Sequence, residues 1–263
     1  MPRAKAVVVI DTHAHLHDAA FDVDRDEVLE RARAAGVSSI VTVGCDISDS
    51  SRAMSLATRT GMSWTLGIHP HEAKDAPEDV AQAFDALLAG ASAKPVAIGE
   101  TGLDFYYDHS PRDVQARLLH QQIAYARARG FPLVFHQRDA FTNFVNTLRE
   151  NRFEEMRGIV HCFTGTPVEA RTLTKQFGLF LGIGGVVTFK NAGALREAVK
   201  TVGLSWIVLE TDCPYLSPIP LRGRRNEPAY LRHTVEALCR ILVCDRLELL
   251  AATTQNARMI YGI

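Results

Sequence analysis

The chain has 263 residues, of which 47% are hydrophobic, and its formal net charge is −1. This length suits one large domain, and the hydrophobic fraction supplies a sizeable core, which excludes a disordered chain. The near-neutral charge excludes a strong overall attraction to nucleic acid, so a polyanion would have to bind at a local basic patch.

Short apolar runs rich in β-branched residues recur along the chain and predict strands that are buried on both faces. In chain order they cover residues 6–10, 39–43, 63–68, 96–98, 133–135, 158–161, 179–183 and 206–209. Between them, acidic or proline-containing starts and glycine-containing ends are typical of helices. Helices are expected at residues 24–35, 77–89, 111–129, 167–177, 228–242 and 245–259.

The alternation of strands and helices predicts a parallel sheet, because parallel neighbours need a helix that crosses back over the sheet. Two arrangements fit this pattern, an open doubly wound sheet and a closed (β/α)8 barrel. No linker, low-complexity tract or internal repeat divides the sequence. We therefore expect one domain over residues 1–263.

Polar residues at the ends of the predicted strands favour the barrel. Histidine, carboxylate and arginine residues follow these strands in DTHAH, GIHPH, GETGLD, FHQRD, VHCFTG and LETDCP. A barrel brings the C-terminal ends of all strands to one face, where active sites of this architecture lie, whereas an open sheet spreads them along a line. The pattern predicts a single-domain α/β protein, a (β/α)8 TIM barrel with a metal site at the C-terminal ends of its strands.

The first of these stretches contains a pair of candidate metal ligands. His13 and His15 stand at alternate positions of a strand, so both side chains point to the same side. An isolated pair of this kind also fits two polar residues at a strand exit. The further candidates, each at a different strand end, are Glu100, His136, His161 and Asp212. Imidazoles and carboxylates in this number suit two divalent cations with a bridging carboxylate.

Longer motifs run through almost the whole chain. They are DTHAHL, GIHPHEA, AIGETGLDFYY, HQRDA, HCFTGT, GGVVTF, ETDCPYL and RGRRNEP, followed by the tail ATTQNARMIYGI. In these motifs the sequence resembles the TatD family of metal-dependent deoxyribonucleases, within the wider amidohydrolase-like barrels. The resemblance implies a (β/α)8-type barrel with a two-metal site that acts on DNA ends.

The resemblance also implies which residues hold the ions. One ion would be held by His13, His15, Glu100 and Asp212. The other would be held by Glu100, His136 and His161. Glu100 would therefore bridge the ions, and Asp212 would also orient or deprotonate the attacking water, which makes these two the expected catalytic residues. His17 stands where many relatives have an acid. We expect it to be a loop residue near the mouth of the barrel, at the C-terminal ends of the strands.

Other polar residues are candidates for contact with substrate. They are His69, Asp104, Arg138, Arg222 and Arg224. The arginines after the last strand, with Arg225, would form a local phosphate patch, although both this run and Arg138 also fit ordinary charged loops. Asp104 fits either a residue that orients a metal ligand or a cap of the following turn. The aromatic residues 105–107 fit stacking on bases or packing on the barrel rim.

Three functions compete at this site. The leading hypothesis is a metal-dependent nuclease that cleaves phosphodiester bonds of DNA, with single strands as the expected substrate. The alternative is a hydrolase of small amide, ester or phosphoester substrates on the same site. A non-catalytic scaffold is the third, and the intact ligand set argues against it. The family is described as Mg-dependent, whereas four histidines and two carboxylates suit Zn²⁺ or Mn²⁺, so the metal stays open.

The cysteines and the N-terminal segment indicate a location. The chain has five cysteines, an odd number without a CxxC pair, which fits a reducing cytoplasm better than a disulfide framework. The apolar run at residues 6–10 is too short for a signal peptide, and none reaches the ~20 residues of a membrane helix. We expect a cytoplasmic protein without membrane contact, and the sequence predicts no stable protein partner.

Overall fold

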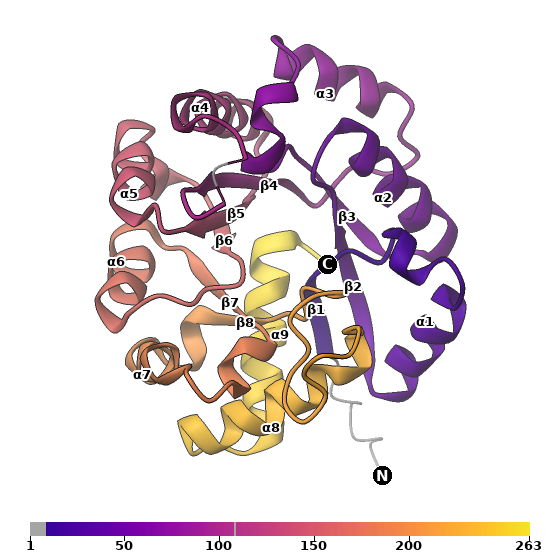
Figure 1. Ribbon diagram of the computed structural model, residues 1–263, viewed down its shortest axis with the longest axis vertical. Helices are drawn as coiled ribbons and strands as arrows, with labels where there is room; N and C mark the ends of the chain where they lie inside the picture. The colour runs from indigo at the N-terminus through magenta and orange to yellow at the C-terminus, as the bar shows by residue number, and fades with distance from the viewer. Residues whose placement is uncertain (1–8, 108) are drawn as a thin grey trace.

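A parallel sheet of eight strands forms the centre of the protein (Figure 1). The computed structural model describes residues 9–107 and 109–263. The strands pair in chain order and are β1 (Val9–Ala14), β2 (Val37–Val43), β3 (Ser63–Leu66), β4 (Ala97–Asp104), β5 (Leu133–Arg138), β6 (Gly158–Val160), β7 (Phe180–Ile183) and β8 (Ile207–Leu209). All eight predicted strands have a counterpart, although residues 6–8 of the first lie outside the described part of the chain.

The sheet comes round on itself where β1 meets the end of β8. Ala14 and Cys213 form a parallel bridge. The amide of His15 donates to the carbonyl of Cys213 at 2.7 Å, and the amide of Asp212 donates to the carbonyl of His13 at 2.9 Å. The described strands therefore form a nearly closed barrel, which confirms the predicted TIM barrel and rules out the doubly wound sheet.

Helices surround the barrel as a ring (Figure 1). They are α1 (Arg25–Ala34), α2 (Ile47–Thr60), α3 (Val80–Ala89), α4 (Arg112–Arg129), α5 (Phe141–Glu150), α6 (Pro167–Phe177), α7 (Gly193–Val202) and α8 (Leu231–Leu242). Short 3-10 helices occur in the connections: η1 (Ala19–Phe21), η2 (Pro70–Asp75), η3 (Phe153–Glu155), η4 (Gly185–Thr188), η5 (Leu204–Trp206) and η6 (Pro228–Tyr230). Across the described ranges, no helix has the length and apolar character needed to cross a membrane.

Three of these helices, α2, α5 and α7, are not predicted from the sequence. The segment of α2 is rich in serine and threonine, and that of α5 contains phenylalanine, valine, threonine and asparagine, all of which have modest helix propensity. Each of these helices buries apolar residues against the barrel, such as Leu56 on α2 and Leu148 on α5. Tertiary packing thus stabilises helices whose local sequence signal is weak.

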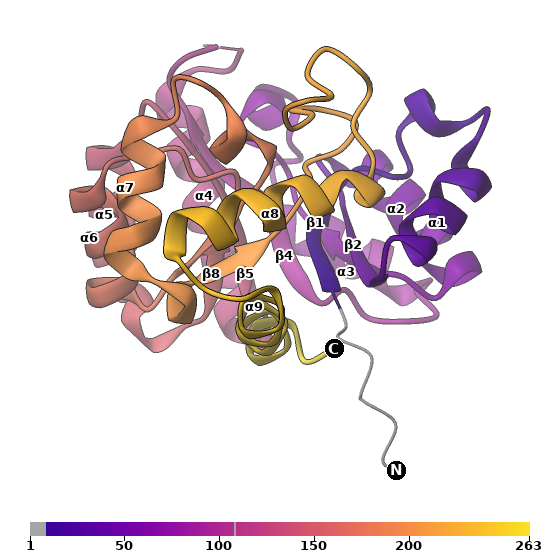
Figure 2. The same cartoon turned by 90° about the horizontal axis from the view of Figure 1, so that it is seen from below.

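A further helix, α9 (Arg246–Tyr261), lies across the N-terminal end of the barrel, below the ring in Figure 2. Its last turns pack against side chains that point into the barrel. This interior cluster consists of Ile10, Val41, Val43, Ala97, Val134, Ile159, Val208, Ala257, Ile260 and Tyr261. Tyr261 donates a hydrogen bond to the carbonyl of Thr12 at 3.1 Å, and Asn256 donates to the carbonyls of Leu204 and Ile207, each at 2.8 Å. The helix closes one end of the barrel and leaves the other end as the mouth.

Candidate metal centre

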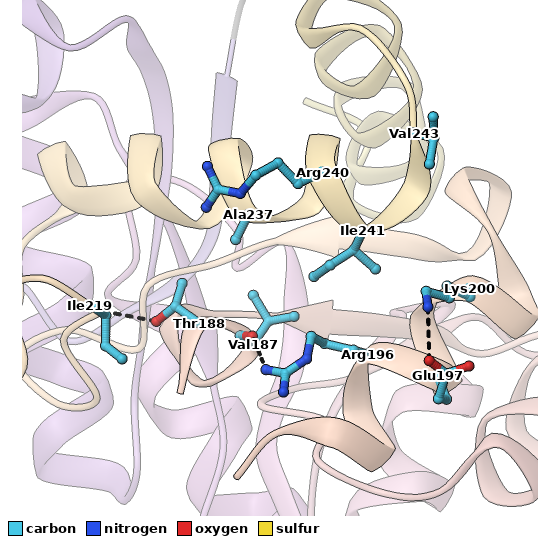
Figure 3. A pocket seen from close by; sticks show the side chains of 10 residues that line it. All are labelled: Val187, Thr188, Arg196, Glu197, Lys200, Ile219, Ala237, Arg240, Ile241 and Val243. Atoms are coloured by element: carbon cyan, nitrogen blue, oxygen red, sulfur yellow. Dashed lines mark hydrogen bonds and ion pairs between the residues drawn. The ribbon is translucent and has the colours of Figure 1, made fainter. Parts of the chain in front are cut away.

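A hollow of about 600 Å³ opens at the C-terminal ends of the strands. Its lining includes His15, His69, Glu100, His136, His161 and Asp212. A second hollow, of about 500 Å³, lies on the outer wall between α7 and α8 (Figure 3). The ten residues that line the second hollow include neither histidine nor cysteine, and their one carboxylate, Glu197, is paired with Lys200 at 2.8 Å. The groups that can bind a metal therefore gather at the mouth.

Simple alternation along three strand ends brings ligand candidates into the mouth. His136, His161 and Asp212 each follow a side chain of the interior cluster by an even number of residues. The interior residues concerned are Val134, Ile159 and Val208. Since side chains of a strand alternate between its two faces, residues at even spacing point to the same side.

The strands β1 and β4 reach the mouth differently. His13 and Glu100 each lie three residues after an interior side chain, Ile10 and Ala97, so uninterrupted alternation would turn them outward. The pairing register shifts between Asp11 and Ala14 in β1 and between Ile98 and Thr101 in β4. Such an irregularity reverses the alternation, as a β-bulge does, and it points both side chains into the barrel.

Glu100 lies at the centre of the donor groups and is only 3% exposed. Around its Oε1, the distances are 2.6 Å to His161 Nε2, 3.0 Å to His136 Nδ1 and 3.3 Å to His69 Nε2. Around its Oε2, they are 3.3 Å to His13 Nε2 and 4.0 Å to His15 Nε2. The two oxygens of one carboxylate thus face different imidazoles, although the rings of His13 and His161 stack on each other with their centres 3.9 Å apart.

Asp212 completes the group on the β1 side. Its Oδ1 lies 3.4 Å from His15 Nε2 and 3.8 Å from His13 Nε2. The two imidazole nitrogens are themselves 3.2 Å apart, so His13 and His15 converge as their spacing predicts. Asp212 has a positive φ of 58°, in the sparsely populated left-handed region, and such backbone conformations concentrate at functional sites.

The donor set fits divalent metal ions. Three groups without cysteine have donor atoms within 4.8 Å of one another, namely His13 with Glu100 and His161, His13 with His15 and Asp212, and His69 with Glu100 and His136. Imidazole nitrogens and carboxylate oxygens are the ligands that Zn²⁺ and Mn²⁺ accept. Lone pairs that converge so closely repel one another, and a cation placed between them removes the repulsion.

Electrostatics favours the ligating forms of Glu100, Asp212 and His13, whereas, despite burial, nearby carboxylates raise the pKa of His161 to about 9. Burial opposes ionisation of Glu100, yet the charges of His161 and the neighbouring imidazoles hold its pKa well below its usual range. Burial also opposes ionisation of Asp212, and the hydrogen bond from His15 lowers its pKa nonetheless. Burial, aided by the charge of His161, lowers the pKa of His13 to about 4, which keeps this imidazole neutral.

Asp104 contacts a histidine of the candidate metal centre from inside the protein. It is fully buried, and its Oδ2 lies 3.0 Å from His136 Nε2 and 2.9 Å from His71 Nε2. Its Oδ1 accepts hydrogen bonds from the amides of Tyr106 at 2.9 Å and Tyr107 at 3.0 Å. Asp104 therefore orients an imidazole and also caps the following turn. It lines the mouth as well, and its direct contact with substrate stays a prediction.

Two other histidines lie near these donor groups. His69, predicted to contact substrate, lies among the donors, with its ring centre 4.5 Å from that of His136 and its Nε2 facing Glu100. His17 is a loop residue that lines the mouth, as expected, and it is buried there, with its Nε2 2.9 Å from Asp49 Oδ2. It stays outside the donor set around Glu100, as expected.

Glu210 is a buried carboxylate next to His161. Its Oε1 accepts a hydrogen bond from the amide of Cys162 at 2.5 Å and lies 3.9 Å from His161 Nδ1. Its Oε2 and His161 Nδ1 are both buried without a hydrogen-bond partner among the described residues. Burial raises the pKa of Glu210 to about 8. Gly182 makes room for this side chain, because a Cβ at that position would collide with Glu210 Oε2.

The predicted basic patch is divided between three places. Arg138 lines the mouth. The guanidinium of Arg222 instead stacks on the ring of Phe189, with its Cζ 4.2 Å from the ring centre. Arg224 lines a separate surface hollow with Arg225, which is ion-paired to α1. Neither Arg222 nor Arg224 lines the mouth hollow, and their contact with substrate stays a prediction.

Sequence reasoning missed several residues that line the mouth, among them Asp49, Tyr215 and Leu216. Tyr215 follows Asp212 by three residues, and its ring centre lies 6.0 Å from that of His15. Its place shortly after Asp212 was the available signal. Cys45 also lines the mouth, and its Sγ lies 3.9 Å from His15 Nδ1.

Known proteins share this architecture and sequence. The family described as TatD related DNase matches residues 10–262. An uncharacterized metal-dependent hydrolase of Bacillus subtilis, YabD, is 40% identical over 97% of this chain and 100% of its own. The 3'-5' ssDNA/RNA exonuclease TatD of Citrobacter rodentium is 36% identical over 97% of this chain and 98% of its own. The crystal structure of YjjV, a TatD homologue from Escherichia coli, matches with a TM-score of 0.90 at 26% identity, over 97% of this chain and 98% of that chain.

The chain belongs to the TatD family. It is accordingly a metal-dependent hydrolase, and the resemblance noted from its motifs is confirmed. Membership of the TatD family agrees with the cluster at the mouth, where histidine, glutamate and aspartate donors converge.

Proposed function

We propose that the protein is a nuclease that hydrolyses phosphodiester bonds of single-stranded DNA at two divalent cations. The observation that carries the proposal is the division of the imidazoles by Glu100. Its Oε1 faces His136 and His161, whereas its Oε2 faces His13 and His15, as a carboxylate that bridges two ions requires. The relative named as an exonuclease of single-stranded DNA and RNA supports a nucleic-acid substrate.

By this proposal each ion has its own set of protein ligands. One set is His13, His15, Glu100 and Asp212, and the other is Glu100, His136 and His161. When bound, the ions lower the pKa of a water molecule and neutralise the phosphoryl oxygens of the substrate. The many imidazoles favour Zn²⁺ or Mn²⁺ over Mg²⁺, which prefers oxygen ligands.

Residues of the chain would supply proton transfer and positive charge. Asp212 is held in its ionised form, and 12% of its side chain is exposed to the mouth, so it can accept a proton from the attacking water. Asp104 holds His136 in place through its Nε2. Arg138 is the one arginine among the described residues that line the hollow, and it would neutralise a phosphate of the substrate.

The experiment is metal-dependent cleavage of labelled single-stranded DNA. Protein stripped by a chelator and reloaded with Zn²⁺, Mn²⁺ or Mg²⁺ should degrade the strand, and His136→Ala should abolish cleavage. His233→Ala, on the outer helix α8, is the matched control and should retain activity. The proposal would be contradicted if no reloaded form cleaved the DNA, or if His136→Ala cleaved it as fast as the wild type. Hydrolysis of small amides or esters without cleavage of DNA would support the alternative substrate class.

The cysteines support a cytoplasmic location. All five are unpaired, as is usual where thiols are kept reduced. We propose that the protein is cytoplasmic and that DNA is its partner molecule. The cleavage assay should also include duplex DNA and RNA as substrates.

A further inference from the structure

Two tyrosines on the rim of the mouth have large exposed surfaces. Tyr106 is 57% exposed and Tyr107 is 49% exposed, although aromatic side chains usually bury most of their area. Both follow β4 directly, and Tyr107 lines the same hollow as Glu100. The rings meet edge to face, with centres 4.8 Å apart. The ring of Tyr107 also lies parallel to that of His109, with centres 5.6 Å apart, and edge to face with that of His71 at 5.4 Å. About half of the surface of each tyrosine nevertheless stays exposed.

Arg138 lies in the corner between the two rings. Its Cζ is 4.1 Å from the centre of the Tyr106 ring and 4.7 Å from that of the Tyr107 ring. Among the described residues no carboxylate pairs with this guanidinium, which lines the hollow at the mouth. A guanidinium plane held against aromatic rings presents both a stacking face and donors for a phosphate.

The position of this group relative to the metal ligands is fixed by Asp104. One carboxylate oxygen of Asp104 accepts hydrogen bonds from the amides of Tyr106 and Tyr107. The other oxygen contacts Nε2 of His136. A single buried side chain thus connects the backbone of the tyrosine pair to a donor of the candidate metal centre.

We propose that Tyr106, Tyr107 and Arg138 form a subsite that stacks an unpaired nucleobase next to the phosphate held at the metal centre. The proposal rests on the proposed nuclease function and names how that site recognises a single strand. Every base has a flat face, so such stacking tolerates any sequence. In a duplex both faces of an internal base are covered by its neighbours, so the subsite accepts only a base that has left the stack.

The test is a double-mutant cycle between the ring and the base. Wild type, Tyr107→Ala and Tyr107→Phe are each assayed on a short oligothymidylate and on an abasic phosphodiester strand of equal length. We expect Tyr107→Ala to raise KM for oligothymidylate about 5- to 150-fold, the range for loss of one base stack, with little change in kcat. Tyr107→Phe keeps the ring and should behave as wild type.

The abasic strand gives the decisive readout. Removing the bases should raise KM in the wild type but add little in Tyr107→Ala, because each change removes the same contact. Equal losses by Tyr107→Ala on both strands would mean that the ring only supports the fold, and the subsite would be wrong. Unchanged KM in Tyr107→Ala would overturn the subsite while leaving the nuclease intact. Absence of cleavage by the wild type on either strand would instead overturn the proposed function and the subsite with it.

Discussion

At the scale of single residues, Glu100 is distinguished by the five imidazoles that lie within 4.0 Å of its carboxylate oxygens. A buried carboxylate is stable only when it is paired, and removing one partner of such a set leaves uncompensated charge. Its two oxygens each face a different group of imidazoles. Substitution of this one side chain should therefore affect both groups at once.

Glu100→Gln tests this directly. The amide keeps the shape but loses the charge and one acceptor oxygen, so it cannot bridge two cations. We expect reconstituted protein to hold at most one ion per chain instead of two, measured by elemental analysis after gel filtration. Glu72→Gln, an exposed residue on the rim of the same hollow, is the matched control. Two ions retained by Glu100→Gln would contradict the bridging role.

Gly182→Ala tests the buried partner of His161. The added Cβ would collide with Glu210 Oε2 and push the carboxylate away from the Cys162 amide and from His161 Nδ1. Loss of such an outer partner typically weakens metal binding about 10- to 100-fold, which competition with a chromogenic chelator measures. Gly193→Ala, where a Cβ meets nothing, should bind metal normally. Normal affinity in Gly182→Ala would show that Glu210 does not position this imidazole.

At the scale of elements, the irregular strands explain what sequence could predict of the site. The alternation rule places His136, His161 and Asp212 on the inner side, because each follows an interior side chain by an even number of residues. The same rule turns His13 and Glu100 outward, since the register shifts in β1 and β4 depend on pairing with neighbouring strands. Family motifs identified all of these residues, but only the structure shows how two of them reach the mouth.

The sequence also did not predict how several other polar side chains are packed and hydrogen-bonded. Arg222 and Arg224 look like one basic run, yet the loop after β8 directs Arg222 onto Phe189 and Arg224 toward the outer surface. Asp104 follows a strand end as a substrate contact would, yet local turns and a neighbouring strand engage both of its oxygens. Such roles depend on loop conformation, which alternation and propensity do not determine.

The helix α9 should contribute strongly to stability through Asn256. Its amide nitrogen donates to the carbonyls of Leu204 and Ile207, and Asn256→Ala leaves both acceptors unsatisfied. We expect a loss of about 1–3 kcal/mol in the free energy of unfolding, measured by urea denaturation. Gln255→Ala, the exposed neighbour on the same helix, should change it little. A small effect of Asn256→Ala would mean that water replaces the side chain.

The ion pair between α1 and the loop after β8 should make stability depend on pH. The hydrogen bond from Arg225 is the main cause that lowers the pKa of Asp24 in the folded protein. A lowered pKa stabilises the fold above the unfolded value of about 3.9, and this contribution is lost as pH falls through the folded value. Asp24→Asn should thus lower Tm at neutral pH, and the difference from wild type should shrink progressively as the pH falls below the unfolded value. Asp75→Asn is the exposed control, and a difference that persists in acid would contradict the account.

At the scale of the whole molecule, the closed sheet makes the metal centre part of one cooperative unit. Convergence of polar strand ends predicted this topology from the sequence, because no open sheet brings six separate ends together. The proposed ligands come from β1, β4, β5, β6 and the end of β8, so bound ions would connect strands on all sides of the barrel. The energy of binding should therefore appear in global unfolding.

Reloading the chelated protein with metal should raise Tm in a single transition. Free ion at a hundredfold excess over Kd adds about 2.7 kcal/mol, which corresponds to roughly 5–10 °C for a chain of this size. Differential scanning calorimetry with and without chelator measures the shift. The His136→Ala protein should show a smaller shift, and two separate transitions in the wild type would contradict a single cooperative barrel.

The placement of α9 has a practical consequence for handling the enzyme. The helix and the C-terminus that follows it lie at the opposite end of the barrel from the mouth (Figure 2). An affinity handle fused after Ile263 would extend away from the strand ends that surround Glu100. Immobilising the protein on a sensor chip through this end would leave the mouth facing the flowing solution, so that oligonucleotide binding is measured without steric interference from the support.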